Sequence, residues 1–170
     1  PIEKQNEKIK AEAYAAVFEG ADFVDDKNID DALAKYNEKL ANGEVKADAM
    51  GETLSDVEIS EVMKAQKDGA DAGYVVTCSG KGYGGSVTLA LGVDKDGNIV
   101  GIRVTDCSNE TPGLGQNSAT SWNEQYIGMS KGDSGLSVVK DGSGSADQGT
   151  VNAISGATIT SRAVTRAVNG

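Results

Sequence analysis

The sequence contains no histidine, and its 170 residues include only two cysteines, two prolines and one tryptophan. The absence of histidine excludes nucleophiles of the Ser-His-Asp and Cys-His types. Two cysteines without histidine also fall short of the four protein ligands of a structural zinc site. The acidic stretch 94–98 lacks the glycine and the bidentate glutamate of a calcium loop, and a hairpin turn explains it. We therefore predict no catalytic side chain and no metal site.

Positive charge is scarce as well. Sixteen basic residues stand against 26 acidic ones, which gives a formal net charge of -10. Such a surface repels nucleic acids and anionic lipids, so we predict no nucleic-acid partner. No apolar run approaches the roughly 18 residues that a membrane-spanning helix needs. The length is that of a single domain, and aromatic residues make up only 5% of it, so its core must be aliphatic.

Helices are predicted at both ends of the sequence. Residues 2–18 have a helical pattern whose first two turns are almost wholly polar, which fits either a stalk leading from a membrane anchor or a solvated terminus. A second helix is predicted over 30–41, capped by Asn28 or Asp30. The last helix begins at Thr158, and Ile159, Ala163, Val164, Ala167 and Val168 form its apolar stripe.

Between these helices the pattern changes to β-branched and alternating residues with turn signals. Asp-Gly pairs at 68–69 and 96–97 are typical of hairpins. We expect Val87, Leu89, Leu91 and Val93 to share one face of their strand, opposite Thr88, Ala90 and Gly92. The predicted strands are 57–65, 73–80, 86–94 and 98–106, followed by a loop at 107–117, a short helix at 118–128 capped by Ser118, and a brief strand at 136–140. The predicted fold class is α+β, an antiparallel meandering sheet flanked by N-terminal helices and a C-terminal helix.

The two cysteines allow two interpretations. Cys78 ends one predicted strand and Cys107 follows another, two strands further on. A disulfide of about 3 kcal/mol could form if these strand ends met. Because the two strands are not consecutive, we favour two free thiols.

Two stretches are rich in small residues. "SGKGYGGS" (79–86) lacks the spacing of a phosphate-binding P-loop and fits a turn between strands, although Lys81 and Tyr83 could face a ligand there. "SGATITSR" (155–162) places Thr158 where a helix cap belongs. The N–H groups of Ile159, Thr160 and Ser161 and the hydroxyls of Thr160 and Ser161 could then bind a phosphate, which the helix dipole favours by about 0.3–1 kcal/mol. From the pattern alone, a hydroxyl-rich cap without ligand is the simpler interpretation.

Three motifs together resemble a known family. "GKGYGG" (80–85), "ETPGLG" (110–115) and "SGAT" (155–158) resemble, in order and spacing, the bacterial FMN-binding domain found in the G subunit of the Rnf electron-transport complex. The related C subunit of the sodium-pumping NADH:quinone reductase also contains it. "PIEKQNEK" resembles the segment that follows the transmembrane helix of Rnf G subunits. The resemblance thus covers most of the chain.

The resemblance implies a covalent flavin. In the family, a flavin transferase joins FMN through its phosphate to the threonine of the last motif, which is Thr158 here. The implied cofactor-binding residues are Ser155, Gly156, Ala157, Thr158, Ile159, Thr160 and Ser161, with Glu110, Thr111, Gly113, Leu114 and Gly115 against the ring system and Lys81 and Tyr83 nearby. The family usually has an aspartate three residues before the motif's serine, where this sequence has Asn152.

The resemblance also implies a place in a larger assembly. Residues 1–18 would be a juxtamembrane stalk and 19–170 the FMN-binding domain, on the extracytoplasmic side of the membrane and held there by an N-terminal anchor. The expected partners are the other subunits of an Rnf-type complex, in which this domain relays electrons and is not a complete enzyme alone. Two alternatives stay open: a module that binds FMN or another phosphate ligand non-covalently, and a structural interaction domain with an empty cap.

Overall fold

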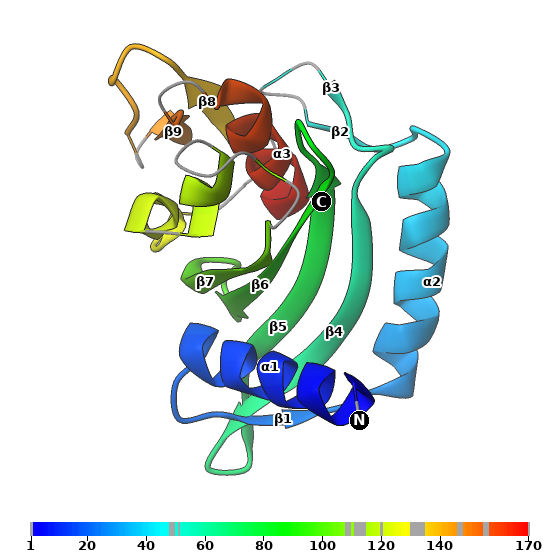
Figure 1. The fold of residues 1–170 in the computed structure, drawn as a ribbon. Helices are drawn as coiled ribbons and strands as arrows, with labels where there is room; N and C mark the ends of the chain where they lie inside the picture. Colours follow the sequence, from blue (N-terminus) through cyan, green and yellow to red (C-terminus); the bar gives the residue numbers. More distant parts are fainter. Residues whose placement is uncertain are drawn as a thin grey trace.

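A five-stranded antiparallel sheet is the centre of the molecule. This computed structural model describes residues 2–47, 50, 52–107, 110, 115–119, 121–129, 135–145, 148–154 and 157–169. The strands lie in the order β1 (Asp22–Val24), β4 (Glu58–Lys67), β5 (Ala70–Lys81), β6 (Ser86–Asp94) and β7 (Ile99–Asp106) (Figure 1). β4 to β7 form the predicted meander, and β1 is an additional edge strand that the sequence did not reveal.

Both predicted Asp-Gly hairpins are confirmed. Asp68 and Gly69 have φ values of 54° and 80°, the left-handed conformations that a tight hairpin between β4 and β5 requires. Between β6 and β7, Gly97 has a φ of 85°, and the Asp94 carboxylate accepts the N–H groups of Asp96 and Asn98 at 2.9 Å each. These turns set the register of the meander.

The two faces of the sheet are covered by different helices. Val87, Leu89 and Leu91 are buried on the predicted apolar face of β6, where α3 (Thr158–Asn169) packs. α2 (Lys27–Ala41) lies along β4 (Figure 1). The predicted stripe of α3 is confirmed at Ala163, Val164, Ala167 and Val168, which are all buried.

The cap of α2 differs from the prediction. Asp26, and neither Asn28 nor Asp30, caps the helix, and its carboxylate accepts the Asn28 N–H at 2.8 Å. Lys64 forms a 3.0 Å ion pair with Asp26. The hydrogen bonds that Asp26 accepts from Lys64 and from the Asn28 N–H lower the pKa of Asp26. The ion pair links the start of α2 to the sheet, a tertiary contact that the local pattern did not contain.

α1 (Ile2–Val17) packs on the opposite face of the sheet, with Ala13, Tyr14 and Val17 buried. Gly92 and Gly101 are cross-strand partners on β6 and β7. A Cβ atom on either glycine would lie 2.3 Å from the Val17 carbonyl oxygen, so these two glycines let the end of α1 approach the sheet backbone. The last turn of α1 is therefore part of the folded unit, while the side chains of Lys8, Ala11 and Glu12 are exposed.

Tyr14 anchors α1 through a buried hydroxyl. Its oxygen donates to Glu61 at 2.8 Å and shares a hydrogen bond with Thr77 at 2.6 Å. Burial raises the pKa of Tyr14, so the hydroxyl keeps its proton. The polar contact fixes where α1 lies across β4 and β5.

We predict that Tyr14→Phe lowers the free energy of unfolding by about 1–2 kcal/mol, because Thr77 is left without its buried partner. Thermal unfolding should show a decrease in Tm of about 2–4 °C for each kcal/mol lost. Tyr74→Phe is the matched control, since Tyr74 is 42% exposed and the same atom is removed. Equal Tm values for the two variants would contradict this role of the Tyr14 hydroxyl.

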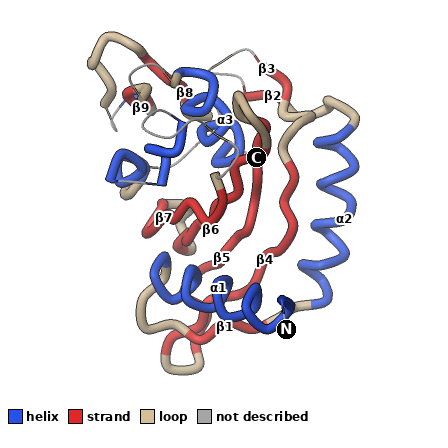
Figure 2. The backbone as a smooth tube through the Cα atoms, in the orientation of Figure 1, coloured by secondary structure: helices blue, strands red, loops and turns tan. Residues whose placement is uncertain are grey.

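The remaining elements lie outside the five-stranded sheet (Figure 2). The predicted helix at 118–128 is instead two 3-10 helices, η1 (Gly115–Ala119) and η2 (Ser121–Tyr126). Ser118 is therefore inside η1 and caps no helix. Its buried Oγ has no hydrogen-bond partner among the described residues. The other elements are two short antiparallel strands, β2 (Lys46–Ala47) and β3 (Glu52–Thr53), and a parallel pair, β8 (Ser137–Val139) and β9 (Thr150–Asn152).

Neither cysteine is part of a disulfide, as predicted. Cys78 on β5 lies opposite Leu89 of β6, so an intervening strand separates it from β7 and Cys107. Burial raises the pKa of the Cys78 thiol to about 12, so it remains a neutral core residue. In the described part of the chain, no helix combines the length and apolar character needed to cross a membrane.

Candidate functional site

α3 begins at Thr158 as predicted, but Thr158 is its first helical residue and not its cap. The Ser161 N–H already donates to the Ala157 carbonyl at 3.1 Å, so Ala157 is the cap and Thr158 the first helical residue. Our expectation that Thr158 caps the helix and that the Ser161 N–H is free is therefore wrong. The N–H groups that precede the first intrahelical bond belong to Thr158, Ile159 and Thr160.

Two of the three hydroxyls in this turn are used inside the protein. Ser161 Oγ donates to the Ala157 carbonyl and accepts the Ile154 N–H, both at 2.9 Å. Thr160 Oγ1 donates to Glu110 at 2.6 Å. Both side chains are fully buried, whereas Thr158 is half-buried and its hydroxyl hydrogen-bonds to none of the described residues. Thr158 is thus the hydroxyl of this turn that is available to a ligand.

The inner side of α3 is held by Tyr126 of η2. Its hydroxyl lies 2.6 Å from Thr165 Oγ1, which in turn donates to the Ser161 carbonyl at 3.0 Å. Tyr126 and Thr165 are both buried, so this chain of hydrogen bonds fixes the helix below its first turn.

Glu110 lies against the tip of the β5–β6 hairpin. This tip, residues 82–85, is closed by a 2.8 Å hydrogen bond from the Gly82 N–H to the Gly85 carbonyl. The Tyr83 N–H donates to Glu110 Oε1 at 2.9 Å, and the Gly84 N–H donates to Oε2. Consecutive backbone donors of this kind form an anion-binding nest. The glycine-rich stretch therefore does cradle an anion, and that anion is the chain's own carboxylate.

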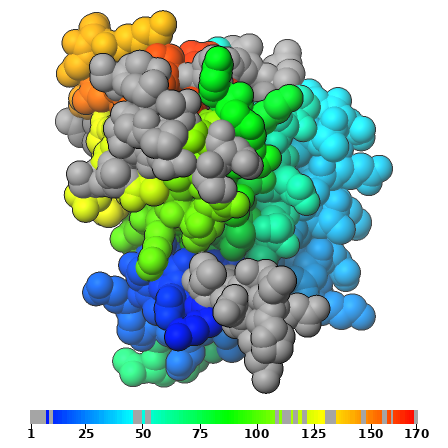
Figure 3. Space-filling model, in the orientation of Figure 1, coloured from blue at the N-terminus to red at the C-terminus, as the bar shows by residue number. Residues whose placement is uncertain are grey.

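Glycine is required at the positions where these segments meet. A Cβ on Gly82 would lie 2.0 Å from Glu110 Oε1, and one on Gly115 would lie 2.7 Å from both Glu110 Cβ and Thr160 Oγ1. A Cβ on Gly80 would lie 2.5 Å from the Ala163 carbonyl oxygen of α3. The glycines of the first two motifs thus allow β5, the hairpin tip and η1 to pack closely against α3. In the space-filling view the green segment that contains the hairpin tip reaches the surface (Figure 3).

Glu110 is 2% exposed and carries its negative charge there. Burial raises its pKa, but the hydrogen bonds from Thr160 and from the N–H groups of Gly84, Tyr83 and Gly85 outweigh burial, so the pKa lies below its usual value.

A second charged contact joins β5 to α3. Arg166 donates to Asp56 through Nε at 3.3 Å and Nη2 at 2.9 Å, and Nη2 also donates to the Lys81 carbonyl at 2.9 Å. The Lys81 N–H donates to Asp56 at 3.0 Å. Sequence reasoning missed Asp56 and Arg166, because 110 residues separate them and neither lies in a motif.

The structure brings most of the predicted site residues together. Glu110, Gly115, Thr160 and the 82–85 tip are in direct contact, and Lys81 and Tyr83 have exposed side chains at that tip. Tyr83 is 75% exposed. Five predicted site residues lie outside the described residues: Thr111, Gly113, Leu114, Ser155 and Gly156.

Asn152 contacts a neighbouring loop through its side chain. Its Oδ1 accepts the Gly144 N–H at 2.8 Å. Its carbonyl accepts Trp122 Nε1 at 2.6 Å and Gln125 Nε2 at 3.3 Å. Asn152 therefore links β9 to η2 just before the α3 segment.

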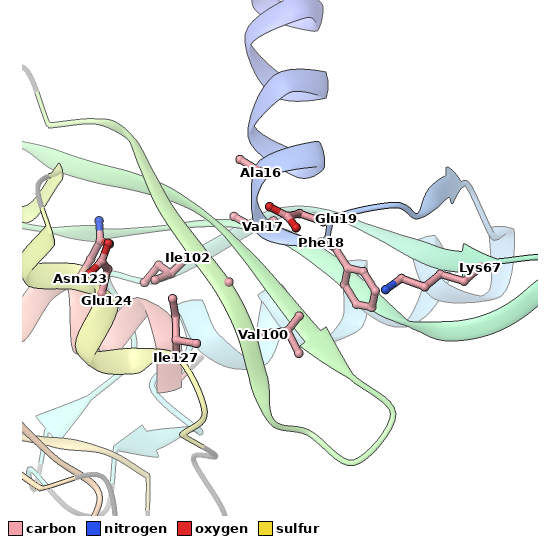
Figure 4. A pocket seen from close by; sticks show the side chains of 11 residues that line it. Ala16, Val17, Phe18, Glu19, Lys67, Val100, Ile102, Asn123, Glu124 and Ile127 are labelled. Carbon is pink, nitrogen blue, oxygen red and sulfur yellow. The ribbon is translucent and has the colours of Figure 1, made fainter.

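A cavity of about 440 Å³ lies elsewhere, at the outer edge of β7 (Figure 4). Val17 from the end of α1, Ile102 of β7 and Ile127 after η2 form its apolar part, and Glu19, Lys67 and Glu124 lie around it. None of the predicted site residues lines this cavity.

The first turn of α3 fits the phosphate of a mononucleotide. It offers adjacent N–H donors, the positive end of a helix dipole and one available hydroxyl, beside a hairpin tip that carries an exposed aromatic ring. The hydroxyl and N–H groups of this turn are hydrogen-bond donors, which suits an anion. The nearby Glu110 carboxylate is already paired with donors of its own.

Comparison with known proteins agrees with this geometry. Residues 82–170 match the model of the FMN-binding domain, so the chain belongs to the FMN-binding domain family. It is 43% identical over 115 residues to the G subunit of the Na(+)-translocating ferredoxin:NAD(+) oxidoreductase complex of Acetobacterium woodii, covering 66% of this chain and 53% of that protein. It is 42% identical over 104 residues to the G subunit of the proton-translocating complex of Clostridium ljungdahlii, covering 61% and 54%. The chain thus spans about half the length of these relatives.

Solved structures give the same result. The C subunit of the Na(+)-translocating NADH-quinone reductase of Parabacteroides distasonis is 28% identical with a TM-score of 0.59, covering 98% of this chain and 89% of that one. NqrC of Shewanella oneidensis is 31% identical with a TM-score of 0.54, covering 64% and 52%. The family resemblance that the three motifs indicated is confirmed.

Proposed function

We propose that this chain is an electron-carrier domain that holds FMN through a phosphoester bond to Thr158. The main support is the distribution of hydrogen bonds in the first turn of α3. Thr160 and Ser161 use their hydroxyls to fix the turn, while the half-buried Thr158 hydroxyl has no partner among the described residues. Attachment at Thr158 therefore breaks no hydrogen bond between described residues.

The protein's part in this function is binding and electrostatics. FMN, when bound, supplies the one- and two-electron chemistry. A phosphodiester at Thr158 keeps one negative charge, which the N–H groups of Thr158, Ile159 and Thr160 stabilise together with the helix dipole. In this proposal the exposed Tyr83 ring covers the flavin.

The wider setting is also a proposal. The relatives are named as G subunits of ion-translocating oxidoreductase complexes, which favours a role relaying electrons beside other subunits of an Rnf-type complex. We further propose maturation by a flavin transferase, an extracytoplasmic position, and a stalk at 1–18 that leads to an N-terminal membrane anchor. In this setting residues 19–170, together with the packed last turns of α1, form the cofactor-binding unit.

The test is intact-mass measurement after coexpression with a flavin transferase, together with fluorescence on a denaturing gel. We expect a mass increase equal to FMN less one water and a fluorescent band. A bare mass with flavin released on denaturation would replace this proposal with non-covalent binding. A bare mass without any flavin, in a sample shown to contain active transferase, would leave a structural domain with an unused cap.

A further inference from the structure

The hairpin tip at 82–85 and the first turn of α3 are joined by one carboxylate. Glu110 Oε1 accepts both the Tyr83 N–H at 2.9 Å and Thr160 Oγ1 at 2.6 Å, while Oε2 accepts the Gly84 N–H. These partners lie 26, 27 and 50 residues away in sequence. Among the described residues, Glu110 is the side chain that bonds both to the 82–85 tip and to the first turn of α3, while Arg166 joins α3 to the Lys81 carbonyl next to that tip.

The surroundings of Glu110 are built for its charge. A buried carboxylate without donors is costly, and one with several directed N–H and O–H donors is stable in its ionised form. Gly82 and Gly115 lack side chains where a Cβ would collide with Glu110. Bonded in this way, Glu110 has little capacity left for a ligand, whereas the family resemblance implied a place against the flavin ring system.

We propose that Glu110 is the positioning residue of the flavin site: its carboxylate fills the backbone nest at 82–85 and, through Thr160, fixes that nest two residues from Thr158. The role of Glu110 in flavin binding rests on the proposed function, because the turn that Glu110 fixes is the one that would receive FMN. The contact itself is independent of any flavin and can be tested without it.

The first experiment measures amide hydrogen exchange in the flavin-free domain, comparing wild type with Glu110→Ala and Glu110→Gln. Hydrogen bonds to a charged group contribute enough that losing them should raise exchange at residues 82–85 roughly 10- to 100-fold in Glu110→Ala. Exchange in β6 around Leu89 should not change. Glu44→Ala is the control, since Glu44 is exposed and lies far from the tip in sequence.

Chemical rescue separates the charge from simple packing. Formate or acetate can enter the space left in Glu110→Ala and occupy the nest, so either ion should restore protection at 82–85, whereas chloride at equal ionic strength should not. Unchanged exchange in Glu110→Ala, or protection that no carboxylate restores, would overturn the proposal. If Glu110→Ala does not fold, Glu110→Gln and Thr160→Val provide the same comparison, with Thr160→Val removing only the link to α3.

The second experiment measures the rate of flavin attachment by the transferase. Misplacement of the acceptor by about 1 Å can cost on the order of 100-fold in rate, so Glu110→Gln and Thr160→Val should load FMN at least about 10-fold more slowly than wild type. Loading of both variants at the wild-type rate would overturn the positioning role. If wild type itself accepts no flavin while formate rescue succeeds, the proposed function fails and the role of Glu110 in holding the tip stands.

The pH dependence of amide protection at 82–85 gives a further test of the role of Glu110. Because the folded pKa of Glu110 is lowered, its stabilising contribution is present above the unfolded value of about 4.3 and is lost as the pH falls through the folded value. Wild type should therefore lose protection at 82–85 in that acidic window, and Glu110→Gln should show no such step. A step of equal size in Glu110→Gln would contradict the assignment to this carboxylate.

Discussion

Replacing Thr158 by alanine is expected to abolish covalent flavin attachment completely. The substitution removes the hydroxyl that would carry the phosphoester and leaves the rest of the first turn intact. Because Thr158 is half-buried at the helix start and its hydroxyl has no partner among the described residues, the free energy of unfolding should change by only about 0.5 kcal/mol. Intact mass after coexpression with the transferase, and a fluorescent band on a denaturing gel, provide the measurement.

Two other hydroxyl variants of this turn serve as controls. Thr158→Ser keeps an acceptor and should retain the adduct at a lower level. Ser161→Ala removes a hydroxyl that bonds to Ala157 and Ile154, so it should lower stability and still carry flavin. A flavin band in Thr158→Ala, or its loss only in Ser161→Ala, would move the attachment site to another residue.

Substituting Gly80 by alanine is expected to cause the largest loss of stability of the changes considered for this site. The new Cβ would lie 2.5 Å from the carbonyl oxygen of Ala163, and backbone cannot yield as a flexible side chain does. α3 must then shift away from β5, which loosens the packing of Ala163 and Val164. Overpacking of this kind costs about 2–3 kcal/mol, which corresponds to a Tm lower by about 5–10 °C.

Ser79→Ala is the matched control for Gly80→Ala. Ser79 is adjacent on β5, and its side chain points to the opposite face of the sheet from position 80. Its Tm should stay close to that of wild type, while flavin loading at Thr158 should fall in Gly80→Ala only. Similar Tm values for both variants would show that α3 tolerates a side chain at this contact.

The meander was predictable because its signals are local. Alternating residues at 86–94 and the Asp-Gly pairs at 68–69 and 96–97 specify strand faces and hairpins from neighbouring residues alone. The 118–128 segment was predicted less well, because its short 3-10 helices are stabilised by packing of Tyr126 and by bonds from Trp122 and Gln125 to β9. β1 and β9 were missed because three-residue strands carry almost no periodic signal.

The sequence by itself determined the α+β class, the meander, the two terminal helices and the family, because periodicity, turn chemistry and three spaced motifs are written in neighbouring residues. It also marked Thr158 as the residue of interest. The tertiary structure decided that the Thr160 and Ser161 hydroxyls of the α3 turn are engaged inside the protein. It also decided that the glycine-rich tip binds Glu110 and that Asp56 pairs with Arg166. Apart from the Ser161 hydroxyl, whose partners are four and seven residues away, these outcomes depend on contacts between residues 26 to 110 positions apart, whose distances no local pattern specifies.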